Sequence, residues 1–483
     1  MIKKHSFTIG YMIGFFTLYS LFILTASAQA KDANPNDPAL FFTPLKQDLQ
    51  HLHPWGPGHG PQRLHSKKPD VHDTVSGYTP ARRCLTCHEG QQNNLHYART
   101  QLICRDCHIS KPIAGIRNPN AAIYAPHRYE QVCAKCHEGA GPGMGSYVIH
   151  ERPPWSQASQ ESFPALYWST WVMLFLAGSV FALFLPYIAA WWWREIKQRK
   201  AAQTQPPTPI TKGPHMARFS PFERGLHTLL VICFMLLSIT GVAWMYVETD
   251  LGNLLNGPLG GYQNAVQIHR LFGLLLMATF VIHIIHLLKG IKQSNAQSLS
   301  GPDSLVWSWQ DFRAFYHHLK WVVGLAPHPV FDRWTWWQKF DYWAVWWGLV
   351  IVGSTGMMLF DTVLTAQLLP GWTMNVARWI HKIEAILAMG HIFVVHFFIE
   401  SYRPHAFPLK DHIFHGATSL EHLKHEHPQW VERLEAQGDL KEHYMAQPPR
   451  MVQIAFFGFA ISMVLLGLFL LFAMLFYAID LSI

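Results

Sequence analysis

The chain has 483 residues, of which 50% are hydrophobic and 14% are charged, and its formal net charge is +8. This composition is typical of a membrane protein with several spans and a sizeable polar part. The basic residues lie next to apolar segments, which is the pattern of membrane topology, so we exclude nucleic acid as a partner.

Residues 1–30 are predicted to be a secretory signal peptide. Lys3 and Lys4 precede an apolar run, and Ala28-Gln29-Ala30 has the small residues of a cleavage site. An uncleaved anchor is the alternative, and it places the following segment on the same side of the membrane.

Residues 31–160 are polar, rich in Pro, Gly and His, and lack sustained hydrophobic periodicity. Such a segment cannot build a large apolar core. It contains six of the seven cysteines, in three copies of a Cys-x-x-Cys-His motif: Cys84, Cys87 and His88; Cys104, Cys107 and His108; Cys133, Cys136 and His137. The two thiols of such a motif bond covalently to the vinyl groups of a haem, and the histidine ligates its iron. Zinc or disulfides are the alternatives, but zinc does not need the trailing histidine each time. The segment is therefore predicted to be a periplasmic domain with three c haems.

The sixth iron positions of these haems have four candidate ligands near the motifs: His72, His96, His127 and His150. We expect three of them to complete low-spin bis-histidine centres, which are suited to electron transfer. Single assignments stay open, because a neighbouring haem's segment can supply a ligand. The nearby histidines also compete for this role: His51, His53, His59 and His65.

Six apolar segments are long enough to span a bilayer. They are Leu166–Trp193, Pro221–Val247, Ala265–Leu288, Tyr342–Phe360, Val376–Glu400 and Val452–Ile479. The first belongs to a predicted anchor helix over 161–200, and a Pro-rich linker over 201–214 follows it. Cys233, inside the second span, is interpreted as a small buried apolar residue.

Lysine and arginine residues indicate the orientation of the spans. The connections 194–224, 289–339 and 403–450 are basic, whereas 248–268 and 361–377 contain no Lys or Arg. The basic connections are therefore predicted to be cytoplasmic. This places the cysteine motifs in the periplasm and the protein in a bacterial inner membrane.

Two stretches are predicted to form helices in the cytoplasm. Aromatic residues among charges over 303–325 indicate an amphipathic helix on the membrane surface. Residues 417–444 are predicted to form a polar helix, on which three histidines lie on a solvated face: His422, His425 and His427. Residues 431–483 form the last predicted part, a cytoplasmic segment and the sixth span.

Histidines inside spanning segments are costly and indicate function. By depth, His269 and His381 lie near the periplasm, and His227 and His396 lie near the cytoplasm. Each pair comes from two different helices, which is the arrangement needed to hold a haem b without covalent attachment. We therefore predict two b haems.

The last span carries one histidine of each pair. His381 and His396 are fifteen residues apart, which on an α-helix gives an offset of about 60° and a rise of about 22 Å. His283 is the main rival ligand, because it lies on the face of His269 at the depth of the cytoplasmic haem. His286 and His391 are interpreted as residues that hydrogen-bond between helices.

Residues 215–430 resemble the bacterial di-haem cytochrome b superfamily, which includes formate dehydrogenase gamma subunits and b-type subunits of nickel-iron hydrogenases. The motifs that carry the resemblance are Phe219-Ser220-Pro221-Phe222-Glu223-Arg224 with His227, Thr240-Gly241, His269-Arg270, Lys339-Phe340-Asp341-Tyr342-Trp343, Thr355-Gly356, His381-Lys382-Ile383-Glu384-Ala385, His396-Phe397, Arg403-Pro404 and Phe407-Pro408.

The resemblance implies a four-helix core with two b haems, ligands at His227, His269, His381 and His396, and quinone chemistry near the cytoplasmic haem. The layout is also similar to fused cytochromes in which a periplasmic multihaem c segment precedes such a b domain. The fifteen-residue spacing of His381 and His396 is one more than the fourteen expected in that family. The first helix and the cysteine motifs are also additions to it.

The predicted fold is an all-α membrane protein of six transmembrane helices, with a di-haem b core and a small, loop-rich multihaem c domain. Its predicted function is respiratory electron transfer from membrane quinol to a soluble periplasmic cytochrome or redox enzyme. No nucleophile, acid–base pair or open metal position stands out in the sequence, so quinol oxidoreduction is the only predicted chemistry. Three alternatives stay open: a quinone-reducing subunit of a periplasmic dehydrogenase, a haem-based sensor or assembly protein, and a terminal catalytic c haem.

Overall fold

The computed structural model describes residues 96, 102, 104–108, 119–202, 213–294, 299–407 and 409–480. The predicted signal peptide, the first cysteine motif (Cys84, Cys87 and His88) and His72 lie outside the described residues, as does most of the predicted linker. The chain divides into two compact units. Unit 1 comprises 1–176 and 354–383, and unit 2 comprises 177–353 and 384–483.

Six helices among the described residues are long and apolar enough to cross a membrane, which confirms the predicted fold class. They are α9 (Pro164–Ala202), α10 (Pro221–Met245), α12 (Tyr262–Gln293), α14 (Trp336–Phe360), the continuous helix Trp372–Tyr402 that begins with α16 (Trp372–Gly390), and α20 (Arg450–Asp480). Most extend beyond the predicted bounds, because polar residues continue the helix outside the apolar run. We call the ends of the spans that join the basic connections 194–224, 289–339 and 403–450 the basic ends. The opposite ends of the spans are called the motif ends.

The start of α10 shows how the sequence sets a helix boundary. Ser220 accepts a hydrogen bond from the backbone N–H of Glu223, and the Glu223 carboxylate accepts one from the backbone N–H of Ser220. This capping box satisfies two N–H groups that a helix start leaves without partners. Pro221 at the first helical position adds a preset backbone angle.

The helix that carries His381 and His396 changes its geometry between them. After α16 the chain continues as two π-helical stretches, η7 (His391–His396) and η8 (Phe398–Tyr402). A π-helical turn takes up an additional residue, and such turns are frequent at functional sites. The spacing of His381 and His396 is one residue longer than in the family, and the π-helical stretch η7 accommodates this additional residue.

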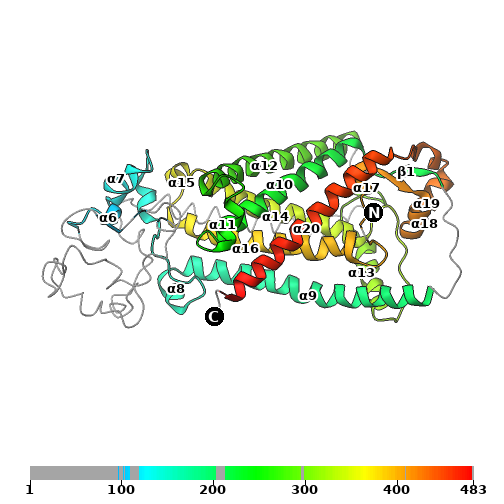
Figure 1. Ribbon diagram of the computed structural model, residues 1–483, viewed down its shortest axis with the longest axis horizontal. Helices are drawn as coiled ribbons and strands as arrows, with labels where there is room; N and C mark the ends of the chain where they lie inside the picture. The colour runs from blue at the N-terminus through cyan, green and yellow to red at the C-terminus, as the bar shows by residue number, and fades with distance from the viewer. Residues whose placement is uncertain are drawn as a thin grey trace. The chain divides into compact units, whose positions relative to one another are not determined.

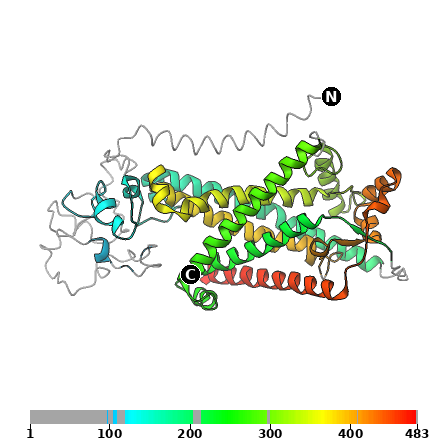
Figure 2. The same cartoon turned by 90° about the horizontal axis from the view of Figure 1, so that it is seen from above.

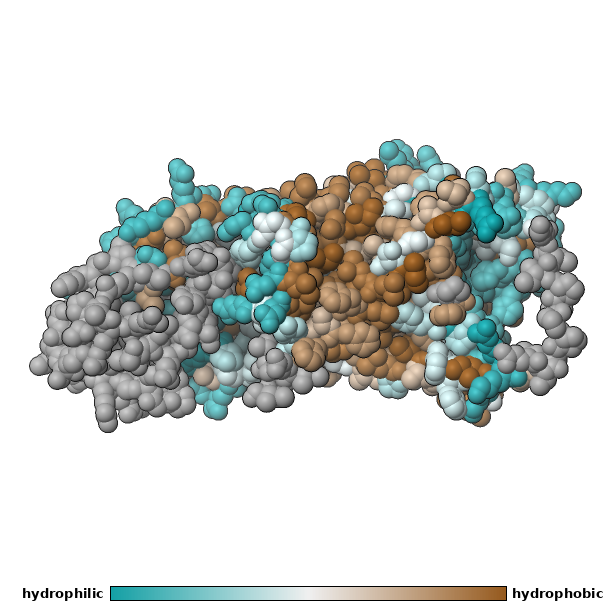
Figure 3. Space-filling model, in the orientation of Figure 1, coloured by the Kyte–Doolittle hydropathy of each residue, from teal (hydrophilic) through white to brown (hydrophobic). Residues whose placement is uncertain are grey.

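The core of unit 2 forms where its helices pack. Helices α10 and α12 run side by side (Figure 1), and Cys233 is fully buried beside Phe280 and Leu349, as predicted for a small apolar residue. Leu470 of α20 packs against Phe393 in a second cluster. On the face drawn in Figure 3, hydrophobic residues cover the middle of the helices and hydrophilic residues gather towards their ends.

A small polar module lies beyond the basic ends of unit 2. Strand β1 (His215–Ala217) pairs antiparallel with β2 (Ala417–Ser419) and with β3 (Tyr444–Met445), in the order β2-β1-β3. Around this sheet lie α17 (His412–His415), α18 (Leu420–Glu426), α19 (Pro428–Gln437) and η9 (Leu440–His443). Figure 2 shows this orange segment gathered beside the green strand β1. The prediction of one helix over 417–444 is therefore wrong, because pairing with β1 makes part of it extended.

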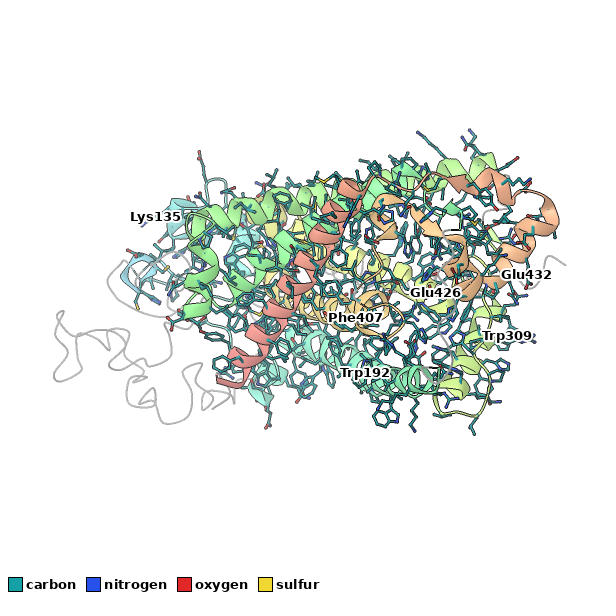
Figure 4. The ribbon with its side chains drawn as sticks, turned by 45° about the vertical axis from the view of Figure 1, so that its right-hand side comes forward. Lys135, Trp192, Trp309, Phe407, Glu426 and Glu432 are labelled. Atoms are coloured by element: carbon teal, nitrogen blue, oxygen red, sulfur yellow. The ribbon has the colours of Figure 1, made fainter. Side chains whose placement is uncertain are left out.

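The interpretation of the three histidines in this module as a solvated face is wrong for His427. Its side chain is completely buried, and its Nδ1 is hydrogen-bonded to the Asp332 carbonyl oxygen at 2.7 Å. Glu426, labelled in Figure 4, precedes His427 at the end of α18. Its carboxylate pairs with Arg403 at 3.0 Å and with His422 at 3.3 Å. Lys410 donates to the same carboxylate at 2.6 Å. Burial opposes ionisation of Glu426, but Lys410 and the other cations hold its pKa well below its usual value.

The predicted surface helix forms as α13 (Trp309–Val322). Its inner face buries His318 and Trp321, whereas Trp309, Phe312 and Tyr316 are exposed. Figure 4 labels Trp309 at the start of this helix. The pattern is that of an amphipathic helix lying at a membrane surface.

The remaining described elements are short. In unit 1 they are α6 (Cys104–Cys107), α7 (Arg128–Gln131), η4 (Cys133–Lys135), η5 (Pro142–Ser146), α8 (Gln157–Ser162) and α15 (Thr362–Leu368). In unit 2, α11 (Asp250–Asn256) connects α10 and α12. In the described part of the cysteine-motif segment, each helical element has six residues or fewer.

Candidate cofactor sites

The second and third cysteine motifs have the same local fold. The backbone N–H of His108 donates to the Cys104 carbonyl oxygen at 2.9 Å, and that of His137 donates to the Cys133 carbonyl oxygen at 2.8 Å. Each motif is thereby closed into one helical turn. This turn holds two thiols and one imidazole together, as attachment to one haem requires.

These two motifs also lie close to each other in unit 1. The Cys107 thiol is near enough to those of Cys133 and Cys136 to interact with them electrostatically. These three cysteines are free thiols, and burial raises the pKa of Cys107 and of Cys133. Thiols that form no disulfides remain available for haem attachment.

His96 approaches the histidine of the third motif. The ring centroids of His96 and His137 are 6.3 Å apart, and their planes make an angle of 85°. The His96 ring also contacts that of Tyr147, at 6.4 Å between centroids. Burial lowers the pKa of His137, which favours the neutral imidazole that ligates iron.

Two further distal candidates are described. His127 donates a hydrogen bond from Nε2 to the Ala121 carbonyl oxygen at 3.0 Å, so a backbone group engages one of its two ring nitrogens. His150 is half-buried in the loop that follows the third motif. Sequence analysis treats His96, His127 and His150 alike, whereas the structure places the His96 ring beside that of a motif histidine.

The third motif rests on the motif end of α16, within unit 1. Cys133 and Met144 pack in one apolar cluster with Ala366 and Met374. The backbone N–H of Gly371 donates to the Gly143 carbonyl oxygen at 2.8 Å. A Cβ atom on Gly143 would overlap the Ala366 carbonyl oxygen, so only glycine allows this approach of the two backbones.

Asn375 and Glu151 complete this contact. Asn375 is fully buried, accepts a hydrogen bond from the Val148 N–H at 3.1 Å and donates to the Val148 carbonyl oxygen at 2.7 Å. The Glu151 carboxylate accepts from Asn375, from Arg378 and, at 3.0 Å, from the indole of Trp379. The segment after the third motif is thus fixed to the helix that carries His381, about 9 Å of helix rise beyond Asn375.

Both histidines predicted near the motif ends are supported by threonine hydroxyls. Thr240 is hydrogen-bonded to His269 Nδ1 at 2.8 Å, and Thr355 is hydrogen-bonded to His381 Nδ1 at 3.2 Å. The glycine after each threonine lies against the imidazole: a Cβ on Gly241 would be 3.7 Å from His269 Cε1, and one on Gly356 would be 3.2 Å from His381 Cε1. Each Thr-Gly pair therefore fixes one imidazole through Nδ1.

The two histidines predicted near the basic ends lie close together in unit 2. His227 and His396 interact electrostatically. The Nδ1 atom of His227 is buried and has no hydrogen-bond partner in the described chain. A buried imidazole nitrogen without a partner is costly. An iron bound at that nitrogen would remove the cost. These residues therefore fit a bis-histidine haem.

Sequence analysis gave no individual role to Asp341, which contacts a candidate haem ligand. Its carboxylate accepts hydrogen bonds from His396 Nδ1 at 3.2 Å and from His391 Nε2 at 3.0 Å. The available signal was an acidic residue directly before a predicted span, in a motif that carries the family resemblance. His391, interpreted as an interhelix hydrogen-bonding residue, makes such a bond here.

The rival ligand His283 has a protein partner. Its Nε2 is hydrogen-bonded to the Tyr342 hydroxyl at 2.9 Å, and its ring lies against Trp346. His286 packs against Phe222 with ring centroids 4.5 Å apart.

A mostly apolar groove of about 370 Å³ lies at the basic end of α10. It is lined by Pro221, Arg224, Gly225, Thr228, Leu229, Ile232, Phe414 and Phe456. Phe414 also contacts the His227 ring, with centroids 5.5 Å apart. The groove therefore places a few polar groups and an apolar wall beside a candidate haem ligand.

Comparison with known families identifies one part of the chain. Residues 143–295 match the family model of prokaryotic cytochrome b561. The match begins in the loop after the third cysteine motif and covers the spans that carry His227 and His269. The match and the six apolar helices indicate a multi-pass membrane protein with a domain similar to b-type cytochromes, a family that binds b haems and transfers electrons in membranes. No curated protein matches the chain.

Proposed function

We propose that the protein transfers electrons between membrane quinone and a soluble redox partner, through two b haems and three c haems, as a quinol dehydrogenase. The observation that carries this proposal is the fixed contact between the third cysteine motif and the motif end of α16. Val148 and Glu151 hold the segment after the motif to Asn375, six residues before the candidate ligand His381. A covalent c haem and a membrane haem would thereby be neighbours in one chain.

We assign His227 and His396 to the b haem near the basic ends. His227 has a buried ring nitrogen without a partner among the described residues and lies near His396. His283, in contrast, already has Tyr342 at its Nε2. Both observations favour His227 over His283.

We assign His269 and His381 to the second b haem, because the sequence predicts a similar depth in the membrane for both. Each is hydrogen-bonded through Nδ1 to a threonine, which fixes the orientation of the imidazole. Bound haem supplies one-electron transfer between its ferric and ferrous states. The chain's own residues orient the imidazoles and keep them in an apolar, water-poor interior.

The groove beside α10 is the proposed quinone site. Its apolar lining suits a prenylated ring, and Arg224 and Thr228 provide donors for a quinone oxygen. It lies beside Phe414, which contacts His227. Quinol oxidised there would release its electrons close to the haem of the basic ends.

The proposed location is a bacterial inner membrane, with the cysteine motifs in the periplasm. The export signal and the basic connections of the sequence support this orientation. A soluble periplasmic cytochrome or redox enzyme would then accept electrons from the c haems.

Haem content tests the ligand set directly. In the purified full-length protein, pyridine haemochrome spectra should give b and c haems in a ratio of two to three. His227→Ala should remove one b haem and keep all covalent haem, whereas His283→Ala should keep both b haems. Loss of a b haem in His283→Ala but not in His227→Ala would contradict the assignment.

A further inference from the structure

We propose that His96 is the distal iron ligand of the haem attached to Cys133 and Cys136, opposite the proximal ligand His137. This inference rests on the proposed function, which places a c haem at that motif. His96 precedes the second motif in the sequence, so proximity along the chain would have assigned it to the second haem. The structure instead places His96 beside His137, in the third motif.

The distance between the imidazoles carries the argument. Two imidazole nitrogens on opposite sides of one metal, each at a bond length of about 2 Å, leave their ring centroids about 6 Å apart. The His96 and His137 centroids are 6.3 Å apart. The separation therefore matches that of two imidazoles bound to one iron, although edge-to-face ring contacts also occur at this distance.

The surroundings agree with this assignment. His127, the nearest alternative in sequence, has its Nε2 engaged by the Ala121 carbonyl oxygen. The His96 ring packs on Tyr147, and Val148 makes the backbone contacts with Asn375. The haem between His96 and His137 would therefore lie at the contact with α16, where an electron passes between the c segment and the b domain.

The ligation would also tie the two described motifs together. Cys107 of the second motif already lies near Cys133 and Cys136. A ligand from the segment before the second motif would close the second and third haems into one unit. Close packing of cofactors suits rapid electron transfer between them.

The test is the spin state of the c haems in the full-length protein. In His96→Ala, one of three covalent haems should become high-spin when ferric and bind carbon monoxide when ferrous, with covalent haem content unchanged. Added imidazole should restore the low-spin spectrum. The nearly perpendicular rings also predict a strongly anisotropic low-spin electron paramagnetic resonance signal in the wild type, which His96→Ala should remove.

Controls identify the haem concerned. His127→Ala should produce no high-spin haem, and in the Cys133→Ser/Cys136→Ser background His96→Ala should add none. If His96→Ala does not accumulate, His96→Met offers a replacement ligand and should raise the potential of one c haem. Three low-spin c haems in His96→Ala would overturn this inference but not the proposed function. Wild-type protein without covalent haem would overturn the proposed function as well.

A second inference comes from an independent observation in unit 2. We infer that Asp341 is a positioning residue that lowers the potential of the haem held by His227 and His396. It also rests on the proposed function. A carboxylate that accepts a hydrogen bond from a ligating imidazole raises the basicity of that ligand, and a more basic ligand stabilises the ferric state.

The other b haem is supported differently. Thr240 donates its hydroxyl proton to the Leu236 carbonyl oxygen at 2.7 Å, so towards His269 Nδ1 it is a neutral acceptor. Hydrogen bonds to a charged acceptor are about twice as strong as neutral ones. The haem at the basic ends would therefore have the lower potential, and electrons would flow from there towards the motif ends, as quinol oxidation requires.

Redox titration of the b absorption band tests this inference. In Asp341→Asn, one of the two b waves should shift upwards by a tenfold change in the ferric-to-ferrous ratio, about 59 mV for a one-electron couple. The other wave should stay in place, and Asp341→Glu should restore most of the wild-type potential. Two unshifted waves, or a downward shift, would overturn the inference. A single b wave with one haem in the wild type would instead overturn the proposed function.

Discussion

The cysteine-motif segment and the helices of unit 2 are stabilised in different ways. The described part of the segment has only a small cluster of its own, formed by Ala121, Ala122, Ile123 and Val132 beside Cys107. The helices of unit 2 bury large side chains such as Trp191, Trp336 and Phe393. We therefore propose that covalent cofactors hold the segment, whereas the helical domain has an apolar core of its own. The b haems of the helical domain should therefore contribute to function more than to folding.

The largest expected effect comes from Cys133→Ser/Cys136→Ser. One of three covalent haems should be lost, and the segment around it should become sensitive to protease, because cofactor attachment replaces core packing there. Covalent-haem staining and limited proteolysis of the membrane-embedded protein measure both. Both b haems should remain, and their loss would show that the two regions fold together.

The next effect is that of His381→Ala. This variant should lose one b haem, about half of the b absorbance, and keep its three c haems and its helical content, because the haem is held by ligands inside an otherwise packed bundle. Absorption spectra and circular dichroism check this. Unfolding of the whole protein would mean that the b haems stabilise the helices as the c haems stabilise the segment.

A smaller effect is expected where the two kinds of region meet in unit 1. Glu151→Gln should weaken the attachment of the segment to α16 by about 2 kcal/mol, because Arg378 loses its carboxylate partner. Thermal unfolding followed through the c haems should show this loss. The exposed Glu161, which accepts a hydrogen bond from Gln157, provides a matched control. An equal effect of Glu161→Gln would contradict the assigned role.

The smallest effect concerns pH and the polar module at the basic ends. The pKa of Glu426 is lowered in the folded state, so its contribution to stability is present at neutral pH and is lost as pH falls below the ordinary value of 4.5 and through the lowered pKa. Glu426→Gln should be less stable at neutral pH, and its stability should fall less steeply below pH 4.5. Thermal unfolding across pH, in detergent, measures both slopes. Parallel slopes would show that Glu426 does not ionise differently in the two states.

The sequence predicted the spans because bilayer-length apolar runs are a local property of the chain. It also predicted the candidate haem ligands of the spans, because a histidine in such a run is costly. The π-helical turn at His391–His396 was visible only as a spacing one residue longer than the family pattern. The additional residue is accommodated by the π-helical geometry, which the composition of the segment does not reveal.

Contacts between distant segments escaped prediction. Strand β1 pairs with residues about two hundred positions away, and Asp341 meets His391 and His396 from another helix. The approach of His96 to His137 likewise crosses a motif boundary. No local period or motif spacing encodes these pairings, because they arise when the helices and loops pack.

The central claim is that electrons pass from quinol through the b haems to the c haems. Stopped-flow absorption of the purified full-length protein, mixed with a menaquinol analogue, tests it by following the b and c bands separately. We expect rapid reduction of the b haems, then of the c haems, and loss of both phases in His396→Ala. If quinol reduces neither band, while a soluble donor reduces the c haems and then quinone oxidises the b haems, electron flow runs inwards and the account is contradicted.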